Sequence, residues 1–359
     1  MWLHAIWFAA GLVALVAGAN ALVHGASRLA LSFGLSPLVV GLTVVAFGTS
    51  APEMAVSAGA VLGGQTDIAV GNVVGSNIFN VLFILGASAL ITPLVVNLQL
   101  IRQEVPIMLG AGLLMLSMGL DGSYTLWEGA LLLGLLVTYT AFLVVQSRRQ
   151  TREAANDYDA ELQPAASGAW DSKWPVQVVL IGLGLGLLVL GADWLVSSAT
   201  VFAKAMGVSD LVIGLTIVAM GTSLPEVAAS LTAAFKGERD MAVGNVVGSC
   251  TFNTLGCLGL SAMLAGTDGV PLSPALLNLD IWVMLAAFLA CLPVFLSGRE
   301  IARWEGGVFL AYYVAYVTYM IMASRHHDAL PAFSGVMLSF VVPLTIVAMV
   351  ATLMRHKPA

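Results

Sequence analysis

The chain has 359 residues, of which 59% are hydrophobic and only 9% are charged, and its formal net charge is −6 at pH 7. With a mean hydropathy of +0.95, it is too apolar to be an ordinary soluble domain, so the composition predicts an all-α polytopic membrane protein. Its three cysteines lie in apolar segments without CxxC spacing, which argues against a disulfide framework or a zinc site.

Apolar segments predict five spans in the first half, near residues 5–25, 36–62, 68–91, 104–120 and 125–146. Five more are predicted near 175–200, 209–235, 241–264, 279–297 and 304–323, and an eleventh near 332–354. The first run lacks a basic region and a small-residue cleavage site, so we interpret it as a retained helix and not a signal peptide. The expected domains are therefore a first half (1–146), a linker (147–174), a second half (175–323), and an extra helix with a tail (324–359).

The linker is polar and carries charges of both signs. Asp157 and Asp159 at alternate positions would fit a calcium sensor, but the segment lacks the glycine and the terminal glutamate of a calcium loop. We therefore interpret it as a solvated cytoplasmic connection.

Basic residues support this count of spans. With the N-terminus outside, only Lys204 and Arg325 of the 14 lysines and arginines fall on the outer side. This distribution predicts an integral membrane protein with residues 147–174 and the C-terminus in the cytoplasm. Since each half has an odd number of spans, the two halves enter the membrane from opposite sides, as inverted repeats do.

One segment of the chain occurs twice. Residues 18–86 align with residues 191–259 without a gap, and 38 of the 69 paired positions are identical. Both copies carry a glutamate, Glu53 and Glu226, inside an apolar run. A carboxylate at membrane depth costs roughly 2.5–3.5 kcal/mol even on the lenient insertion scale, so such residues usually have a function. Two of them related by a repeat predict a cation site.

Hydroxyl side chains accompany both glutamates. On a helix, Thr49 and Ser50 share a face with Glu53, and Thr222 and Ser223 repeat this spacing around Glu226. Glycine and proline next to these residues predict broken helices, because proline removes one backbone donor and clashes with the preceding turn. Carbonyls freed at such a break, those of Thr49 and Thr222 or their neighbours, can face a buried cavity.

The span after each glutamate span contains three polar residues spaced four apart, which lie along one helix face. They are Asn72, Ser76 and Asn80 in the first copy and Asn245, Ser249 and Asn253 in the second. For the outer pair, Asn72 and Asn245, helix packing and a site role are both open, since small polar residues also join membrane helices. For Asn80 and Asn253 we favour a site role.

These residue types favour a hard cation. Two carboxylates, backbone carbonyls, hydroxyls and amides are oxygen donors, and Ca²⁺ takes six to eight of them in flexible geometry. Two negative charges balance one Ca²⁺ or two Na⁺. No histidine or cysteine is needed, which argues against a soft transition metal.

The motifs Gly-Thr-Ser-x-Pro-Glu and Gly-Asn-Val-Val-Gly-Ser-x-x-Phe-Asn, each present twice, resemble the alpha-repeats of the calcium/cation antiporter superfamily. Within it, the chain is similar to prokaryotic sodium/calcium exchangers, so we expect it to lie in a bacterial inner membrane. The resemblance implies a fold of ten helices in two inverted repeats and Na⁺-driven Ca²⁺ exchange, often with three Na⁺ per Ca²⁺. It implies ligand roles for Glu53, Glu226, Thr49, Ser50, Thr222, Ser223, Ser76, Ser249, Asn80 and Asn253, of which Glu53, Glu226, Thr49 and Thr222 are the expected calcium ligands and the whole set the expected sodium ligands.

Three positions depart from this pattern. Some family members carry Asp where this chain has Asn80 or Asn253, which affects ion stoichiometry. Cys250 stands where the first copy has Asn77, so the halves differ there, and we interpret Cys250 as a packing residue. The eleventh span is not part of the ten-helix plan.

Two alternatives to sodium/calcium exchange are considered. A proton/calcium antiporter of the same superfamily typically has a different repeat motif, so sodium is favoured. A membrane enzyme would need a nucleophile–base pair or a metal triad at membrane depth, and the five histidines lie near span ends. His24 and Asp193 are interpreted as interfacial or packing residues. We expect no cofactor, no nucleic acid and no protein partner, only Ca²⁺, Na⁺ and the lipid bilayer.

Overall fold

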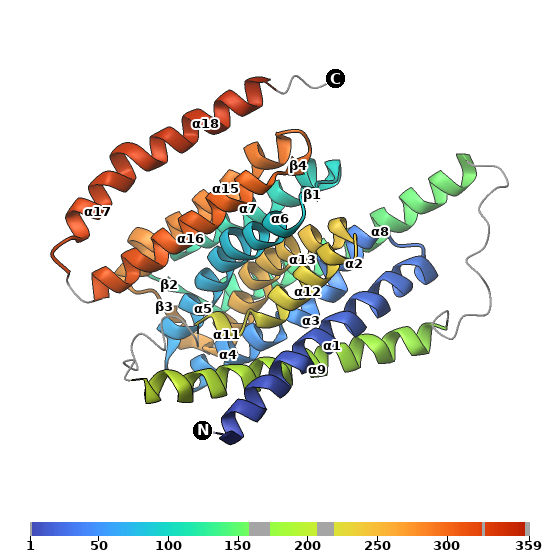
Figure 1. Ribbon diagram of the computed structural model, residues 1–359, viewed down its shortest axis with the longest axis horizontal. Coiled ribbons are helices and arrows are strands. Elements are labelled where there is room, and N and C mark those ends of the chain that lie inside the picture. Colours follow the sequence, from blue (N-terminus) through green and yellow to red (C-terminus); the bar gives the residue numbers. More distant parts are fainter. Residues whose placement is uncertain (1, 158–172, 207–218, 325–326, 356–359) are drawn as a thin grey trace.

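The computed structural model describes residues 2–157, 173–206, 219–324 and 327–355, and these form an almost entirely helical molecule (Figure 1). The first part of the predicted span 209–235 and residues 158–172 of the predicted linker, Asp159 included, lie outside the described residues. π-helices and one 3-10 turn carry the label η.

The first half begins with the long helix α1 (Trp2–Phe33) and continues with a broken span. That span consists of α2 (Pro37–Val40), η1 (Gly41–Val45), α3 (Ala46–Thr49) and α4 (Ala51–Leu62). The third span contains α5 (Thr66–Ile78), η2 (Phe79–Leu85) and α6 (Gly86–Ile91). Strand β1 (Leu94–Val95), η3 (Leu100–Glu104), α7 (Val105–Gly119), β2 (Ser123–Tyr124) and α8 (Leu126–Asp157) follow.

The second half repeats this order. It contains α9 (Trp174–Ala205), α11 (Ala219–Gly221), α12 (Leu224–Phe235), α13 (Arg239–Phe252), η6 (Asn253–Cys257), α14 (Leu258–Leu264) and η7 (Gly266–Asp268). Strand β3 (Val270–Pro271), η8 (Leu276–Asp280), α15 (Ile281–Leu296), β4 (Glu300–Ile301) and α16 (Arg303–Ser324) complete it. A C-terminal unit of α17 (Leu330–Val336), η9 (Met337–Val341) and α18 (Val342–Arg355) follows.

Within the described residues, nine helices are long and apolar enough to cross a membrane, and the bent pair Pro37–Thr49 and Ala51–Leu62 makes a tenth. The short apolar helix α12 belongs to the remaining predicted span. The C-terminal run Leu330–Thr352 is one of the nine. An all-α polytopic membrane protein is therefore confirmed.

Two small antiparallel sheets join the halves. β1 pairs with β4, and β2 pairs with β3, so each sheet connects a loop of one half to a loop of the other. The pairing therefore joins equivalent loops of the two halves, as repeats related by a two-fold axis would.

Tyr124 of β2 is buried in one of these loops. Burial raises the pKa of Tyr124, with a further contribution from the negative charges of Glu128 and Asp121.

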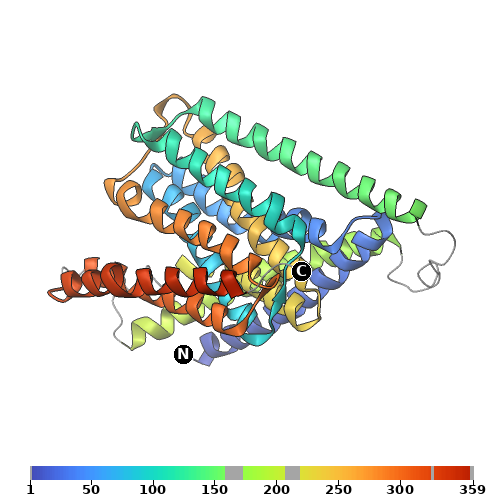
Figure 2. The same ribbon diagram turned by 90° about the horizontal axis from the view of Figure 1, so that it is seen from above.

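Glycines let α1 and α9 approach each other closely. The two helices run side by side along one edge of the molecule (Figures 1 and 2). A Cβ atom added at Gly18 would lie 2.7 Å from the carbonyl oxygen of Gly184, and one at Gly11 would lie 2.8 Å from that of Gly191. Small residues at this spacing bring membrane helices into backbone contact.

Two features extend beyond the predicted boundaries. Helix α8, drawn in green along the upper edge of Figure 2, continues to Asp157, so the first residues of the predicted linker are helical. The C-terminal α18 lies at the opposite edge of Figure 1 from α1, next to α16, where the hydroxyl of Tyr312 donates to Thr345 Oγ1 at 2.7 Å.

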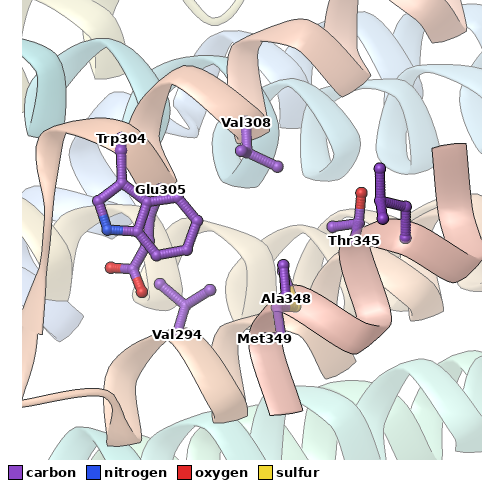
Figure 3. A pocket seen from close by; sticks show the side chains of 8 residues that line it. Val294, Trp304, Glu305, Val308, Thr345, Ala348 and Met349 are labelled. Carbon is purple, nitrogen blue, oxygen red and sulfur yellow. The ribbon is translucent and has the colours of Figure 1, made fainter. Parts of the chain in front are cut away.

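A cavity of about 170 Å³ separates α18 from the core, and Figure 3 shows its mainly apolar lining, which includes Val294, Trp304 and Met349. The cavity lies between α18 and the helices α15 and α16.

Candidate functional site

Both glutamates lie just after a break in a membrane helix. In the first half, the axes of the two arms differ by 42°, and Ser50 (φ −81°, ψ 3°) stands at the break between α3 and α4. Ser223 (φ −88°, ψ 7°) is the equivalent residue before α12. Pro52 and Pro225 each follow in the first turn of the next helix, where proline is tolerated. The predicted break is therefore confirmed in the first half, and in the second half its C-terminal side is described.

The two halves exchange hydrogen bonds at this site. Ser223 Oγ donates to Glu53 Oε1 at 2.8 Å, and Ser50 Oγ donates to Glu226 Oε1 at 3.1 Å. Ser223 Oγ also lies 3.3 Å from Ser76 Oγ. Each carboxylate is thus held by a hydroxyl from the break of the opposite half. Both glutamates are 0% exposed, so the arrangement brings two acids from distant parts of the sequence into one buried polar cluster.

The outer asparagines orient the threonines of this cluster. Asn245 Oδ1 accepts a hydrogen bond from Thr49 Oγ1 at 3.3 Å, and Asn72 Oδ1 accepts one from Thr222 Oγ1 at 3.5 Å. Asn72 Nδ2 in turn donates to the backbone oxygen of Glu53 at 3.1 Å. The two threonine–asparagine bonds cross between the halves, as the serine–glutamate bonds do, whereas the bond from Asn72 to Glu53 lies within the first half.

Two serines that the sequence reasoning missed complete this layer. Asn72 Nδ2 donates to Ser57 Oγ at 3.0 Å, and Asn245 Nδ2 donates to Ser230 Oγ at 2.9 Å. Both serines are 0% exposed. Their identity at equivalent positions of the repeat was the signal that could have found them.

Asn80 and Asn253 lie in the π-helices η2 and η6, which continue α5 and α13. π-helical turns inside α-helices are rare in proteins, and those that occur are often found at functional sites. Both asparagines are 0% exposed. The side chain of Asn253 accepts a weak bond from Cys257 Sγ at 3.4 Å.

Several buried polar atoms of the predicted ligand residues have no hydrogen-bond partner among the described residues. They are Glu53 Oε2, Glu226 Oε2, Ser249 Oγ, both side-chain atoms of Asn80, and Asn253 Nδ2. Leaving such groups buried and unpaired costs about 1–3 kcal/mol each, and more for charged groups, so a native structure needs a reason for them. A cation bound among the oxygen atoms would satisfy the carboxylates.

The donor chemistry fits a hard cation. The two carboxylates, the hydroxyls around them and the amide oxygens are all oxygen donors, which suit Ca²⁺ and Na⁺ better than soft metals. No group of three or more His, Cys, Asp or Glu side chains that could hold a metal ion occurs within the described part of the chain. The three cysteines are buried free thiols.

The halves differ next to this cluster. Asn77 Nδ2 donates to Thr254 Oγ1 at 2.9 Å, and Cys250, which replaces Asn77 in the second copy, directs its thiol at the backbone oxygen of Asn77 at 3.8 Å. Cys250 is fully buried.

His24 and Asp193 lie elsewhere. His24 lines a cavity of about 270 Å³ with Arg28, Lys236 and Glu238, and none of the predicted ligand residues lines it. Burial lowers the pKa of Lys236, although the nearby charge of Glu238 opposes this change. Asp193 is exposed on α9.

The fold is that of a polytopic membrane protein, and comparison with known proteins identifies the family. The family model described as "Sodium/calcium exchanger protein" matches residues 3–145 and 176–322. The chain belongs to this family, within the calcium/cation antiporter superfamily, and is a cation antiporter. The match ends before the C-terminal helix.

Relatives cover nearly the whole chain. It is 41% identical over 324 residues to CaxA of Alkalimonas amylolytica, covering 89% of this chain and 98% of that protein. It is 33% identical over 338 residues to the sodium/calcium exchanger MaX1 of Methanosarcina acetivorans, covering 86% and 95%. Among solved structures, the sodium-calcium exchanger NCX_Mj without Na⁺ and Ca²⁺ matches with a TM-score of 0.75 and 31% identity, covering 89% of this chain and 99% of that one.

Proposed function

We propose that the protein exchanges Na⁺ for Ca²⁺ across the membrane by alternating access, at a site formed by both halves. The observation that carries the proposal is the crossed pair of hydrogen bonds, Ser223 to Glu53 and Ser50 to Glu226. It leaves one oxygen of each carboxylate without a hydrogen-bond partner among the described residues, in a buried cluster of other oxygen donors.

Charge supports calcium as one substrate. Glu53 and Glu226 supply two negative charges, and the amides Asn80 and Asn253 add none, so one Ca²⁺ or two Na⁺ neutralise the pair. An empty site would carry two uncompensated charges through a medium of low dielectric constant, which is costly. If the site changes the side to which it opens only when a cation occupies it, the protein exchanges cations and does not let them leak.

The hydroxyls support sodium as the other substrate. Ser50 and Ser223 bond the carboxylates, and Ser76 lies next to Ser223. We assign Thr49, Thr222 and Ser249 to the same hydroxyl set, because the repeat places them at positions equivalent to one another or to Ser76. Sodium accepts neutral oxygen ligands, so flanking sites can hold it next to the glutamates. The relative MaX1 is named a sodium/calcium exchanger, which agrees with this assignment.

The inverted repeat supplies the geometry for alternating access. Each half contributes the same broken helix and the same polar stripe, and inverted halves can exchange conformations to open the site to either side. We also propose that the protein lies in a bacterial inner membrane, as its similarity to bacterial relatives suggests. The basic residues indicate that the N-terminus is outside and the C-terminus is cytoplasmic.

Transport in proteoliposomes tests the coupling ion. Vesicles loaded with Na⁺ and diluted into Na⁺-free medium should take up ⁴⁵Ca²⁺, and a sodium ionophore should abolish the uptake. A matched set of vesicles carries only a proton gradient. Uptake driven by the proton gradient and not by sodium would assign the protein to proton/calcium antiport instead.

A further inference from the structure

Two more buried acids lie outside the cation site, at equivalent positions of the two halves. Glu104 is the last residue of the π-helix η3, and Asp280 is the last residue of the π-helix η8. Glu104 is 0% exposed and Asp280 is 6% exposed. Buried acids in membrane spans are costly and usually have a role.

Each acid accepts a hydrogen bond from a tyrosine of the next span. Tyr139 of α8 donates to Glu104 Oε2 at 2.6 Å, and Tyr316 of α16 donates to Asp280 Oδ1 at 2.9 Å. Glu104 Oε1 also accepts bonds from Gln99 Nε2 and Gln103 Nε2, both at 2.8 Å. The bonds to the acids hold α8 to the start of the α7 span and α16 to the start of the α15 span.

One helical turn before each tyrosine, a side chain of the same helix packs on the ligand-bearing span of the opposite half. In α8, Leu136 covers Gly256, where an added Cβ atom would lie 2.9 Å from Leu136 Cδ2. In α16, Tyr313 packs edge-on against Phe79 and Phe83, with ring centroids 5.3 and 5.5 Å apart. The two contacts are equivalent, since Gly256 occupies the position of Phe83 in the repeat.

These contacts fall within the π-helices of the candidate site. Gly256 belongs to η6, which begins with Asn253, and both phenylalanines belong to η2, which contains Asn80. The rotation per residue about the helix axis is smaller in a π-helix than in an α-helix. The π-turn therefore determines the direction in which the asparagine side chain leaves the helix. A side chain wedged against it can therefore fix the asparagine's direction.

We propose that Glu104 with Tyr139, and Asp280 with Tyr316, are positioning residues that act across the halves. The first pair holds Leu136 against the π-turn of Asn253, and the second pair holds Tyr313 against the π-turn of Asn80. This inference rests on the proposed function, because it treats both asparagines as part of the cation site.

A crossed set of double variants tests the proposal. Apparent affinity for Ca²⁺ or Na⁺, whichever the purified protein binds, is measured from the cation-dependent rise in its unfolding temperature. Tyr139→Phe removes one hydroxyl and should weaken binding about two- to thirtyfold, the usual range for coupling from outside a site. This effect should vanish in the Asn253→Ala background and persist in the Asn80→Ala background.

Tyr316→Phe should show the reverse dependence, with its effect lost only in the Asn80→Ala background. Glu104→Gln, with Tyr139 in place, keeps an acceptor for the tyrosine hydroxyl and should retain near-parent affinity. In transport, Tyr139→Phe should raise the KM for Ca²⁺ more than it lowers the maximal rate. If Tyr139→Phe does not fold, Leu136→Ala acts at the next contact and should give the same crossed pattern.

If one asparagine variant binds cations too weakly to measure, the comparison in the other asparagine variant still tests the proposal. In that variant, only one of the two tyrosine substitutions should change the affinity. Equal effects of both tyrosine variants in both backgrounds, or unchanged affinity in both, would overturn the inference while leaving the proposed function intact. A parent protein that binds neither cation would overturn the proposed function, and the inference with it.

Discussion

Replacing Glu226 with glutamine separates the charge of the site from its shape. Glu226 is fully buried, its Oε1 atom accepts the hydrogen bond of Ser50 at 3.1 Å, and its Oε2 atom has no partner among the described residues. Glutamine has nearly the same shape and keeps an oxygen acceptor for Ser50. Glu226→Gln therefore removes one negative charge and little else.

The expected effects on affinity and stability have opposite signs. Losing one partner of a buried charge pair typically costs about 2–5 kcal/mol, so Ca²⁺ should bind about thirty- to several-thousandfold more weakly. Without cations, a neutral amide is cheaper to bury than a carboxylate. The unfolding temperature of the variant in cation-free detergent should therefore equal or exceed that of the parent.

Thermal unfolding with and without Ca²⁺ measures both effects. At a Ca²⁺ concentration 100 times its dissociation constant, the parent gains about 2.7 kcal/mol of stability. A variant with at least thirtyfold weaker affinity gains no more than about 0.9 kcal/mol at the same concentration. Asp193→Asn, at an exposed acid of α9, is the matched control and should behave like the parent. If Glu226→Gln is stabilised as much as the parent, Glu226 is not a calcium ligand.

Three further predictions concern packing, orientation and the extra helix. Gly184→Ala should destabilise the protein by about 1–3 kcal/mol in thermal unfolding, because the new Cβ atom would lie 2.6 Å from a backbone nitrogen of α1. Gly186→Ala is the control and should be neutral, since a Cβ atom added there would have no neighbouring atom within 4 Å. Single cysteines at Gly122 and Gln150, in a variant without native cysteines, should react with membrane-impermeant reagents from the outside and from the cytoplasm respectively; reaction from the same side would refute the topology. Deleting residues 325–359 should leave Ca²⁺-induced stabilisation intact, and its loss would show that the C-terminal helix supports the site.

The sequence alone predicted the class of fold, and it indicated both glutamates and the serines that bond them, because the repeat carries both signals. Apolar runs predict spans, and an identical glutamate in two such runs indicates a shared site. The ungapped alignment also contains Ser57 and Ser230, whose role became clear only from their bonds to Asn72 and Asn245.

The crossed partners could not be predicted, since a linear repeat does not say which hydroxyl faces which carboxylate. Within one copy, Ser50 is spaced to share a helix face with Glu53, yet its hydroxyl bonds Glu226 of the other half. The break in the helix axis turns the serine away from its sequence neighbour, and only the packing of the halves supplies the partner.

The second pair of acids was hidden by a difference in loop length. Glu53 and Glu226 are 173 residues apart, whereas Glu104 and Asp280 are 176 apart, so an ungapped comparison does not pair them. Asp in place of Glu obscures the match further. Their equivalence follows from the structure, where both end a π-helix and both accept a tyrosine hydroxyl.

One difference between the halves would affect the balance between the inward-facing and outward-facing states that the proposed alternating access requires. Two identical halves would exchange roles at no cost, so the inward-facing and outward-facing states would have equal free energies apart from the membrane and its ions. Asn77 bonds Thr254 at 2.9 Å, while the equivalent pair in the repeat is Cys250 and Val81, which cannot form such a bond. A buried hydrogen bond between neutral groups contributes about 0.5–1.5 kcal/mol. If the halves separate at this contact during exchange, this one bond suffices to populate one state several times more than the other.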